Sequence, residues 1–398
     1  MQRLVLNKNE ERRVRAGHLW IFSNEVDTAR SPLKAFSPGQ CALVEDSRGR
    51  ALGTAYVNPS TLIAARVICA PGELPDRDMI ARRLAAADAL RRSLYPEPWY
   101  RMCYSEGDML PGLVIDRYGS DFCVQIGTAG MELFRDDIVA LLKEEYGASS
   151  VFIKNSIRSR ELEGLPTEDI AVFGSVPDPI AVRENGCLYE TSLTGGQKTG
   201  WFYDQRENRA AIRPFCSGAR VLDAFCYVGS FGAYAAANGA REVVLADASR
   251  SALEYAQRNT ERAFAAAGAA PCAATLAGDA FETLAGLAAD GERFDVVCVD
   301  PPAFIKRSKD RQRGLEAYAA VNGLAVRLLA KGGILVTASC SQHLEAGELY
   351  AAAARAAARK RRVLQCIRRG GQAADHPAHP SMPETTYLKS FMFREINV

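Results

Sequence analysis

Cys340 lies between two serines in the segment TASCSQHL, directly after the apolar run GGILVTA. A cysteine thiolate is a strong nucleophile that forms covalent intermediates with substrates. A free cysteine is also among the residue types most often buried in protein cores, and this chain has 11 cysteines. The elements that position Cys340 therefore decide between a nucleophile and a small buried side chain.

Four acidic residues follow apolar runs in the second half of the chain: Asp223 in VLDAF, Asp247 in VLADAS, Asp279 in AGDAF and Asp300 in VCVDPPAF. In an open parallel sheet, ligands bind outside the carboxyl ends of the strands. Asp247 comes about 20 residues after a glycine-containing turn, where a carboxylate accepts hydrogen bonds from ribose hydroxyls. The order and spacing of these residues predict a site for a nucleoside cofactor.

The turns after two of these strands have a special composition. DAFCYVGSFG places Gly229 and Gly232 after the first strand, where glycine lets the backbone approach a ligand closely. The turn lacks the Gly-x-Gly-x-x-Gly pattern, so pyrophosphate binding is not favoured. After the fourth strand, Pro301 and Pro302 make a stiff turn ahead of the aromatic Phe304.

From about residue 181, apolar strands alternate with helices. We expect strands in ARVLDAF, EVVLADA, FDVVCVD and ILVTASC, and a helix from Ser249 to Gly268. Near-continuous apolar strands between helices predict an α/β fold, with a Rossmann-like, doubly wound and largely parallel sheet. The segment YAAAARAAARKRRVLQC is interpreted as a solvated helix with a basic tip.

The first half of the chain has a different pattern, and we expect three domains. Residues 1–72 show short strands broken by turn residues, which predicts a small β-barrel. Residues 73–180 mix strands and helices, including a helix capped by Asp76, and predict an α+β middle domain. Residues 181–398 form the sheet domain described above.

The composition excludes several classes of protein. The net charge is +2 and charged residues make up 24%, so nucleic-acid binding is neither required nor excluded. The charged N-terminal segment predicts no signal peptide, and no run is apolar enough for a membrane span. There is no Cys-x-x-Cys pair and the cysteine count is odd. We therefore expect a reduced, cytoplasmic protein without a metal site.

The motifs resemble those of class I S-adenosylmethionine-dependent methyltransferases. GGQKTGWFYDQRENR (195–209), DAFCYVGSFG, DPPAF, SCS and ADHPAHPSMPETTYLKS are similar to segments of one bacterial family, the large-subunit ribosomal RNA cytosine-C5 methyltransferases with an N-terminal PUA domain. GHLWIFSNEV and LGTAYVNPSTLIAARVI resemble its PUA module. RSRELEGLP and YSEGDMLPGLVIDRYG extend the resemblance to the middle domain.

This resemblance implies S-adenosyl-L-methionine as cofactor and 23S ribosomal RNA as substrate, and it favours a homodimer. Asp247 would bind the ribose, Asp279 and Ala280 the adenine, and Asp223 and Gly229 the methionine end. The full set of implied cofactor-binding residues is Tyr203, Asp204, Gln205, Arg206, Asp223, Phe225, Tyr227, Gly229, Asp247, Asp279, Ala280 and Asp300. A second interpretation of Arg206 and Arg209, as surface charges on an entering helix, stays open.

The implied chemistry gives Cys340 a role. A thiolate that adds to carbon 6 of cytosine makes carbon 5 nucleophilic enough to accept a methyl group. We assign Cys340 as the nucleophile, Asp300 as the hydrogen-bond partner of the target base, and Phe304 as a residue that stacks on the base or shapes its pocket. Some other cytosine-C5 families carry a second cysteine where this chain has Pro302 and Ala303. The group that removes the carbon-5 proton is thus unassigned. His343, three residues after Cys340, is a candidate for tuning the thiol.

The RNA-binding candidates are basic side chains, and a flipped-out or single-stranded base is the expected target because carbon 6 is inaccessible in a duplex. The candidates are Arg12, Arg13, Arg15, Lys154, Arg158 and Arg160. Each has the alternative role of a solvated surface charge.

Three other functions remain open at the level of sequence. A uracil-C5 methyltransferase also uses a cysteine nucleophile, and an Asp-Pro-Pro-aromatic turn could hold an exocyclic amine for amino-group methylation. An RNA-binding assembly factor could retain the cofactor fold without turnover.

Overall fold

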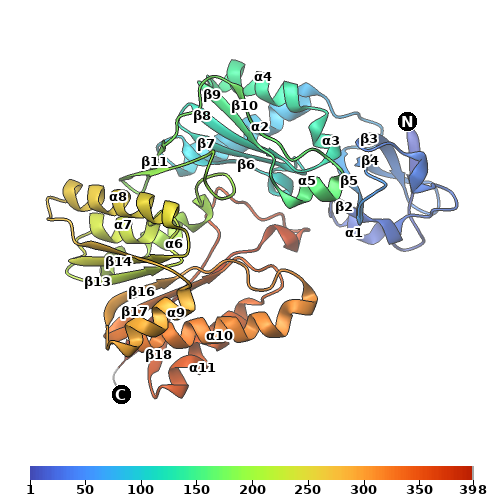
Figure 1. The fold of residues 1–398 in the computed structure, drawn as a ribbon. Coiled ribbons are helices and arrows are strands. Elements are labelled where there is room, and N and C mark those ends of the chain that lie inside the picture. The colour runs from blue at the N-terminus through green and yellow to red at the C-terminus, as the bar shows by residue number, and fades with distance from the viewer. Residues whose placement is uncertain (397–398) are drawn as a thin grey trace. The chain divides into compact units, whose positions relative to one another are not determined.

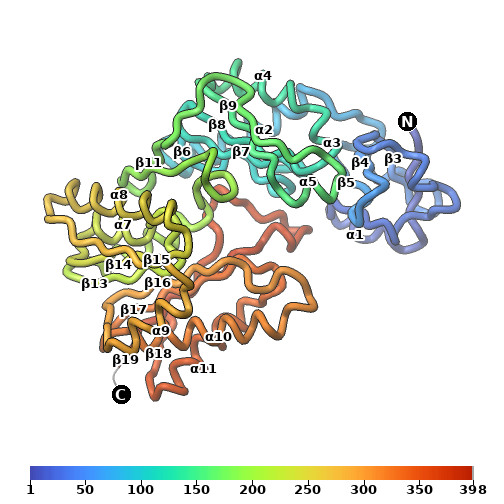
Figure 2. The backbone as a smooth tube through the Cα atoms, viewed as in Figure 1, coloured from blue at the N-terminus to red at the C-terminus, as the bar shows by residue number. Residues whose placement is uncertain are grey.

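The computed structural model describes residues 1–396, which form two compact units (Figures 1 and 2). The first unit contains Met1–Ile180, Ser192–Tyr203 and Ala374–Thr385, and the second contains Ala181–Thr191, Asp204–Ala373 and the chain from Thr386 onward. Two segments of the predicted 181–398 domain thus cluster with the first unit. The division at residues 72 and 180 remains a proposal.

The N-terminal part of the first unit is built on a mostly antiparallel sheet with the strand order β1-β3-β4-β5-β2. Its elements are β1 (Gln2–Val5), α1 (Glu11–Arg15), β2 (Trp20–Phe22), η1 (Ser23–Glu25), η2 (Leu33–Ala35), β3 (Gln40–Glu45), β4 (Ala51–Val57) and β5 (Ile63–Cys69). An isolated antiparallel bridge between Leu6 and Val26 joins the residues that follow the two edge strands. Leu4, Ile21 and Val44 belong to its buried apolar core.

The rest of the first unit has a second sheet, with the order β10-β9-β8-β7-β6. Its elements are α2 (Arg77–Leu94), β6 (Trp99–Tyr104), η3 (Ser105–Asp108), β7 (Leu113–Tyr118), β8 (Asp121–Ile126), α3 (Ala129–Glu132), α4 (Arg135–Tyr146), β9 (Ser150–Lys154), α5 (Arg158–Glu163) and β10 (Asp169–Phe173). The predicted helix cap is confirmed, because the Asp76 side chain accepts a hydrogen bond from the Met79 amide at the start of α2.

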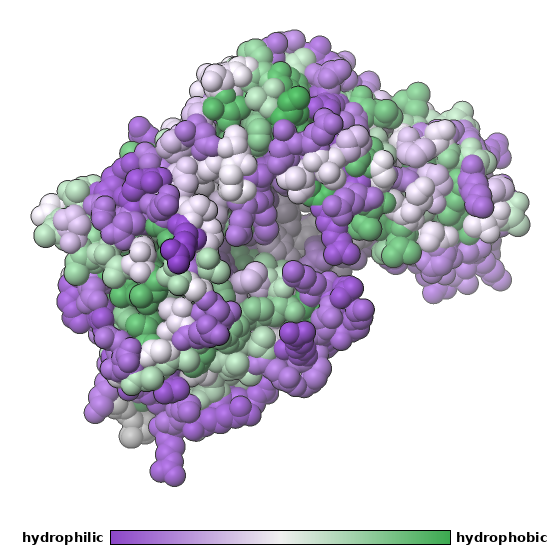
Figure 3. Space-filling view, in the orientation of Figure 1, coloured by the Kyte–Doolittle hydropathy of each residue, from purple (hydrophilic) through white to green (hydrophobic). Residues whose placement is uncertain are grey.

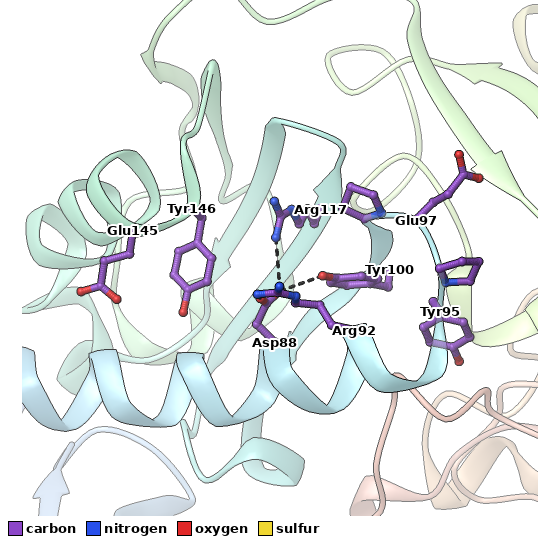
Figure 4. A pocket seen from close by; sticks show the side chains of 10 residues that line it. Asp88, Arg92, Tyr95, Glu97, Tyr100, Arg117, Glu145 and Tyr146 are labelled. Carbon is purple, nitrogen blue, oxygen red and sulfur yellow. Dashed lines mark hydrogen bonds and ion pairs between the residues drawn. The ribbon is translucent and has the colours of Figure 1, made fainter.

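A pocket of about 420 Å³ lies in this unit, beside the C-terminal half of α2 (Figure 4). The buried carboxylate of Asp88 accepts a 2.7 Å hydrogen bond from the Tyr100 hydroxyl and lies 3.3 Å from the Arg117 guanidinium. These bonds tie α2 to strands β6 and β7. They offset the free-energy cost of burying the Asp88 carboxylate. The polar groups at the centre of this pocket therefore have a structural role.

The second unit contains a sheet with the order β15-β14-β13-β16-β17-β19-β18. Its elements are β11 (Ile180–Glu184), β12 (Cys187–Thr191), η4 (Tyr203–Gln205), α6 (Arg206–Ala210), η5 (Arg213–Phe215), β13 (Arg220–Ala224), α7 (Ser230–Ala237), β14 (Glu242–Asp247), α8 (Arg250–Ala266), β15 (Ala273–Ala277), α9 (Ala280–Ala289), β16 (Phe294–Val299), η6 (Ser308–Asp310), α10 (Arg311–Leu328), β17 (Leu329–Ser339), α11 (Ala346–Arg359), β18 (Val363–Gly371) and β19 (Lys389–Ile396). The short helix η7 (Pro383–Thr385) lies in the segment Ala374–Thr385, which clusters with the first unit. Strands β13 to β17 are parallel, and β19 is antiparallel to both of its neighbours. The predicted doubly wound, parallel-rich sheet is confirmed.

Helices cover both faces of this sheet, as the strand pattern predicts. On one face, α7 lies so close that a Cβ on Gly232 would stand 2.6 Å from Leu245. On the other face, Leu222 and Leu335 share a buried core with Val321 of α10 and Leu349 of α11. Alternate residues of each strand thus point to opposite helical layers, which explains why the strands are apolar almost throughout. Hydrophilic and hydrophobic residues are interspersed over the visible face of each unit (Figure 3).

The interpretation of residues 350–366 as a solvated helix is wrong in two respects. Helix α11 ends at Arg359, and residues 363–366 begin strand β18. The helix is also buried along one face, where Leu349, Ala353 and Ala357 join the core. Alanine occurs on both the buried and the exposed face of this helix, so the contrast between the two faces is weak. The apolar face was therefore not recognised from the sequence.

The interpretation of Arg206 and Arg209 as surface charges is also wrong. Both side chains are buried, and both bind the buried carboxylate of Glu184 at the end of β11. Arg209 donates hydrogen bonds of 2.6 and 2.8 Å to the two Glu184 oxygens, while Arg206 lies 3.4 Å from one of them. This buried ion cluster fixes α6 against the β11–β12 hairpin.

We predict that Glu184→Gln destabilises the second unit by about 3–5 kcal/mol, because it removes the charge of the buried carboxylate that pairs with two buried guanidinium groups. Chemical denaturation followed by circular dichroism measures the change. The matched control is Arg241→Ala, which removes an exposed pair with Asp295 at 3.6 Å and should cost less than about 1 kcal/mol. Equal effects of the two substitutions would contradict this prediction.

Candidate active site at the carboxyl edge of the sheet

The predicted chemical residues meet at one edge of the sheet in the second unit. Asp223 and Asp247 lie at the ends of β13 and β14, Asp300 directly follows β16, and Cys340 directly follows β17. Because β14, β13, β16 and β17 are consecutive parallel neighbours, their carboxyl ends lie at the same edge. Asp300 and Cys340 therefore follow two adjacent strands.

The turn after β13 has an unusual backbone. Phe225, Tyr227 and Gly229 have φ values of 59°, 51° and 75°, in the left-handed region. Non-glycine residues seldom adopt this conformation, and such strain is retained where the surrounding structure holds it. The Tyr227 amide donates a 2.9 Å hydrogen bond to Asp247, which holds the turn against the end of β14.

Gly229 is required for packing as well as for its backbone conformation. A Cβ at this position would stand 2.8 Å from the Cβ of Ala256 in α8. No side chain fits there, so glycine lets the start of α7 lie directly on α8. Approach to a cofactor, the reason for the sequence-based assignment, stays a prediction.

The Asp223 carboxyl at this edge has a strongly raised pKa. Burial raises the pKa of Asp223 to about 7; the Gly232 amide, which donates a 2.8 Å hydrogen bond to it, opposes the shift, and the charges of Asp300 and Asp247 add to it. The Asp223 carboxyl is thus buried where the charges of Asp300 and Asp247 also disfavour its ionised form. A cation bound at this edge would relieve the repulsion.

That property fits S-adenosylmethionine, which carries a sulfonium and an ammonium group. Asp223, Asp247 and Asp300 supply the negative potential that such a ligand requires at this edge of the sheet. The residues present therefore fit the implied cofactor.

The other strand-end acids have defined local partners. Asp247 accepts hydrogen bonds from the amides of Tyr227 and Ser249, while Ser249 itself caps α8, as predicted. Asp279 is exposed and caps α9 through the amides of Phe281 and Glu282, and the next residue, Ala280, is buried. The roles of Asp247 in ribose binding and of Asp279 and Ala280 in adenine binding stay predictions.

Asp300 is held by residues that directly precede the sheet. Gln205 donates a 2.8 Å hydrogen bond to an Asp300 oxygen, and Asn208 donates a 2.7 Å hydrogen bond to the Gln205 oxygen. Asn208 thereby fixes the orientation of the Gln205 amide. The predicted closeness of the 204–206 segment to the strand ends is thus seen for Gln205, and a direct contact of Gln205 with cofactor stays a prediction.

Asp204 and Tyr203 have different partners. Asp204 is buried, accepts a hydrogen bond from the Tyr387 hydroxyl, and accepts another through its carbonyl from the Ala373 amide. Tyr203 belongs to the first unit, where its hydroxyl donates a 2.9 Å hydrogen bond to the Arg117 carbonyl. The role of Tyr203 in cofactor binding stays a prediction.

Cys340 lies in a turn that buried hydroxyl groups hold in place. The Tyr318 hydroxyl accepts a 2.6 Å hydrogen bond from Ser339 and lies 2.8 Å from the Ser341 hydroxyl. The Ser341 hydroxyl in turn accepts a 3.2 Å hydrogen bond from the Ile305 amide. The two serines that flank Cys340 are thus connected to the turn after β16, while Cys340 itself is partly exposed.

Cys340 differs in this from several other cysteines. Cys123, Cys226 and Cys298 are buried, and burial is the main cause that raises the pKa of each thiol. A neutral buried thiol is unreactive. These three cysteines are core residues, whereas Cys272 is exposed.

Phe304 belongs to an aromatic cluster beside the same turns. Its ring centroid lies 4.8 Å from Tyr318, 5.9 Å from Phe281 and 6.4 Å from Phe225. The side chain is partly buried by these contacts. Of its two predicted roles, shaping the pocket agrees with these contacts, and stacking on the target base is not tested.

The basic candidates for RNA binding fall into two groups. Arg12 and Arg158 are exposed, and Arg13 and Arg15 form ion pairs with Glu25 and Asp46. Lys154 and Arg160 are buried, and their interpretation as surface contacts is wrong. Lys154 donates to the carbonyls of Leu193 and Gly196, and Arg160 donates to those of Ile126 and Pro166.

Several residues of the site were not identified from the sequence. They are Asn208, Tyr318, Ser339, Ser341 and Lys389. The serines flanking Cys340 were visible in the sequence, but their hydrogen-bond partners come from α10 and β19. These partners are far away in the sequence, so no local sequence pattern predicts the contacts.

Comparison with known proteins identifies the family. Residues 4–69 match a PUA-like domain and residues 172–394 match an S-adenosylmethionine-dependent methyltransferase domain. The ribosomal RNA large subunit methyltransferase I of Photobacterium profundum is 36% identical over 395 residues, with 98% of each chain covered. The chain belongs to the ribosomal RNA large subunit methyltransferase I family. The protein of this name from Cronobacter sakazakii is also 36% identical, with 98% of each chain covered.

The fold of this family member is also found among solved structures. A SAM-dependent methyltransferase candidate from Streptococcus mutans superimposes with a TM-score of 0.81 at 19% identity, covering 99% of this chain and 100% of its own. The predicted PUA-like domain, methyltransferase fold and S-adenosylmethionine cofactor are therefore confirmed.

Neither a metal site nor a membrane-spanning helix is found in the part of this family member that the structure describes. Between residues 1 and 396, no group of three or more His, Cys, Asp and Glu side chains is arranged to hold a metal ion. In the same range, no helix is both long and apolar enough to cross a membrane.

We predict that Asp223→Asn changes how stability depends on pH. The raised pKa means that the Asp223 contribution to stability is complete below about pH 4 and is lost as pH rises through about 7. Without cofactor, the midpoint of thermal unfolding of the Asn variant should therefore improve relative to the natural protein between pH 5 and pH 8. The Asn oxygen can still accept from the Gly232 amide. A constant difference between the two proteins would contradict this assignment.

Proposed function

We propose that this protein is a 23S ribosomal RNA methyltransferase that forms 5-methylcytosine through a covalent bond between Cys340 and carbon 6 of the base. The observation that carries the proposal is the position of Cys340. It is a partly exposed cysteine on the strand adjacent to that of Asp300, at the same sheet edge as the carboxyl groups that fit the cofactor. Two relatives that match nearly the whole chain are named as large-subunit ribosomal RNA methyltransferases.

The cofactor, when bound, supplies a methyl group on a sulfonium. Asp223 and Asp300 would face its positive charge, and Asp247 would accept hydrogen bonds from its ribose. Because these carboxyl groups repel one another without a cation, part of the binding free energy comes from relieving that repulsion.

The chain's own residues account for the steps on the base. The Cys340 thiolate would form a bond to carbon 6, and electron density would move to carbon 5, which accepts the methyl group. Asp300, held by Gln205, would hydrogen-bond to the base and fix its orientation. Loss of the carbon-5 proton and release of the thiolate then restore the aromatic ring. The residue that removes this proton is not assigned.

RNA binding is proposed to use the PUA-like domain and exposed basic side chains. Unstacking the target base costs a few kcal/mol, which contacts with phosphates elsewhere must offset. Arg12 and Arg158 are the exposed candidates from the sequence. The Arg13 guanidinium is hydrogen-bonded to both Glu25 and His18. It could contact RNA only by breaking those interactions.

We predict that Cys340→Ala abolishes methylation of unmodified large-subunit RNA, because the covalent step needs the thiolate. Mass analysis of digested RNA after incubation with labelled S-adenosylmethionine should detect 5-methylcytosine with the natural protein and none with the variant. Cys272→Ala is the matched control, since Cys272 is exposed, and it should retain full activity. Methylation that survives in Cys340→Ala would return Cys340 to a packing role and favour amino-group chemistry.

The same assay separates the remaining alternatives. RNA with 5-fluorocytosine at the target position should trap the natural protein as a covalent adduct, because fluorine cannot be removed as a proton. The adduct should survive denaturing electrophoresis and be absent with Cys340→Ala. A methylated uracil as product would establish the uracil-C5 alternative. Cofactor and RNA binding without any methylated product would favour the non-catalytic assembly factor.

A further inference from the structure

Lys389 lies at the turn that contains Cys340, although the two residues are far apart in the sequence. It is the first residue of β19 and is paired in register with Ser339, the last residue of β17. Its ammonium donates a 2.7 Å hydrogen bond to the Ser341 carbonyl and a 3.0 Å hydrogen bond to the Tyr387 carbonyl. The ammonium is therefore held at the turn that contains Cys340.

The second of these carbonyls is itself fixed. The Tyr387 hydroxyl donates to the buried carboxylate of Asp204, so the backbone before β19 is anchored at two points. Lys389 is half-buried, and a long side chain with both acceptors in place has little freedom left. The position of the charge is thus determined by the fold and not by a flexible surface side chain.

The two carbonyl acceptors are neutral, so they do not cancel the charge of the ammonium. Burial lowers the pKa of Lys389, and the negative charges of Glu345 and Cys340 oppose that change. The interaction with Cys340 is attractive when the thiol is ionised. By reciprocity, the same interaction favours the ionised thiol.

We propose that Lys389 is a positioning residue that holds its ammonium beside Cys340 and stabilises the thiolate. This inference rests on the proposed role of Cys340 as nucleophile. The thiol proton leaves to solvent, the sulfur retains the electron pair, and the ammonium remains protonated throughout. No other reactant is required.

Other titratable groups around this turn act in different directions. Glu345, at the start of α11, carries a negative charge that partly offsets Lys389, and Asp300 adds negative charge at the end of β16. Burial raises the pKa of Tyr318, which therefore stays neutral at pH 7. His343 is exposed in the same turn. The Arg311 guanidinium also reaches this turn, where it donates a 3.1 Å hydrogen bond to the His343 carbonyl, but it is paired with Glu348. The Lys389 ammonium is fixed against the cysteine turn by two hydrogen bonds to carbonyl groups.

The test measures the reactivity of the Cys340 thiol without RNA or methyl transfer. The full-length protein is alkylated with iodoacetamide from pH 5.5 to 10, and the Cys340 peptide is quantified by mass spectrometry. In the alkylation step sulfur bonds to the methylene carbon and iodide leaves. Lys389→Met should move the inflection of the rate about one pH unit higher and slow the reaction about tenfold at pH 7, because less thiolate is present.

Three further variants separate charge from simple support of the turn. Lys389→Gln keeps N–H donors but has no charge, so it should behave like Lys389→Met. Lys389→Arg keeps the charge and should stay near the natural profile. Lys331→Met is the matched control, since Lys331 is an exposed lysine toward the other end of β17. It should leave the profile unchanged. Thermal unfolding midpoints and S-adenosylmethionine affinity check that each variant is folded.

The outcomes distinguish this inference from the proposed function. An unchanged alkylation profile in a folded Lys389→Met or Lys389→Gln protein would overturn the role of Lys389, even if Cys340→Ala is inactive. A shifted profile together with an active Cys340→Ala would support the effect of Lys389 on the thiol and overturn the proposed catalytic use of that thiol. A natural profile in Lys389→Gln with a shifted one in Lys389→Met would show a structural role and overturn the electrostatic one.

Discussion

The parallel pairing of β14, β13, β16 and β17 is the constraint on which the rest of the second unit depends. Each strand is hydrogen-bonded to the next in the same direction, so side chains from distant parts of the sequence arrive at one edge. Asp223, Asp247, Asp300 and Cys340 share that edge for this reason alone. Covering the sheet with helices on both faces leaves this edge as the place where polar groups can gather.

Placing carboxyl groups close together in a partly desolvated region costs free energy. In this protein the effect is seen at Asp223. Asp223 is buried near Asp247 and Asp300, and its pKa is raised to about 7. A stable fold does not need this arrangement, since apolar side chains could occupy the strand ends at less cost. The strain fits a cationic ligand. Under the proposed assignment, this edge is a binding site that is less favourable for stability because it is prepared for its ligand.

A second layer of residues gives the reactive groups their orientation. Asn208 holds Gln205, which holds Asp300, and the Tyr318 hydroxyl connects both serines beside Cys340. Strand β19 contributes from the opposite direction, because its antiparallel pairing with β17 brings its first residue to the end at which Cys340 lies. The family match covers both the sheet and this returning strand.

The sequence by itself determined the strand–helix alternation, the caps at Asp76 and Ser249, the sheet edge and the residues expected there, because these follow from local periodicity and from strand ends. The tertiary structure alone decided which charges are buried. Lys154, Arg160 and Arg206 look like surface residues in the sequence, and each is buried among acceptors that lie far away along the chain or on another element. The end of α11 and the strands β18 and β19 were likewise not predicted. An alanine-rich helix has little apolar contrast, and an antiparallel return strand is specified by its neighbours in the sheet and not by its own residues.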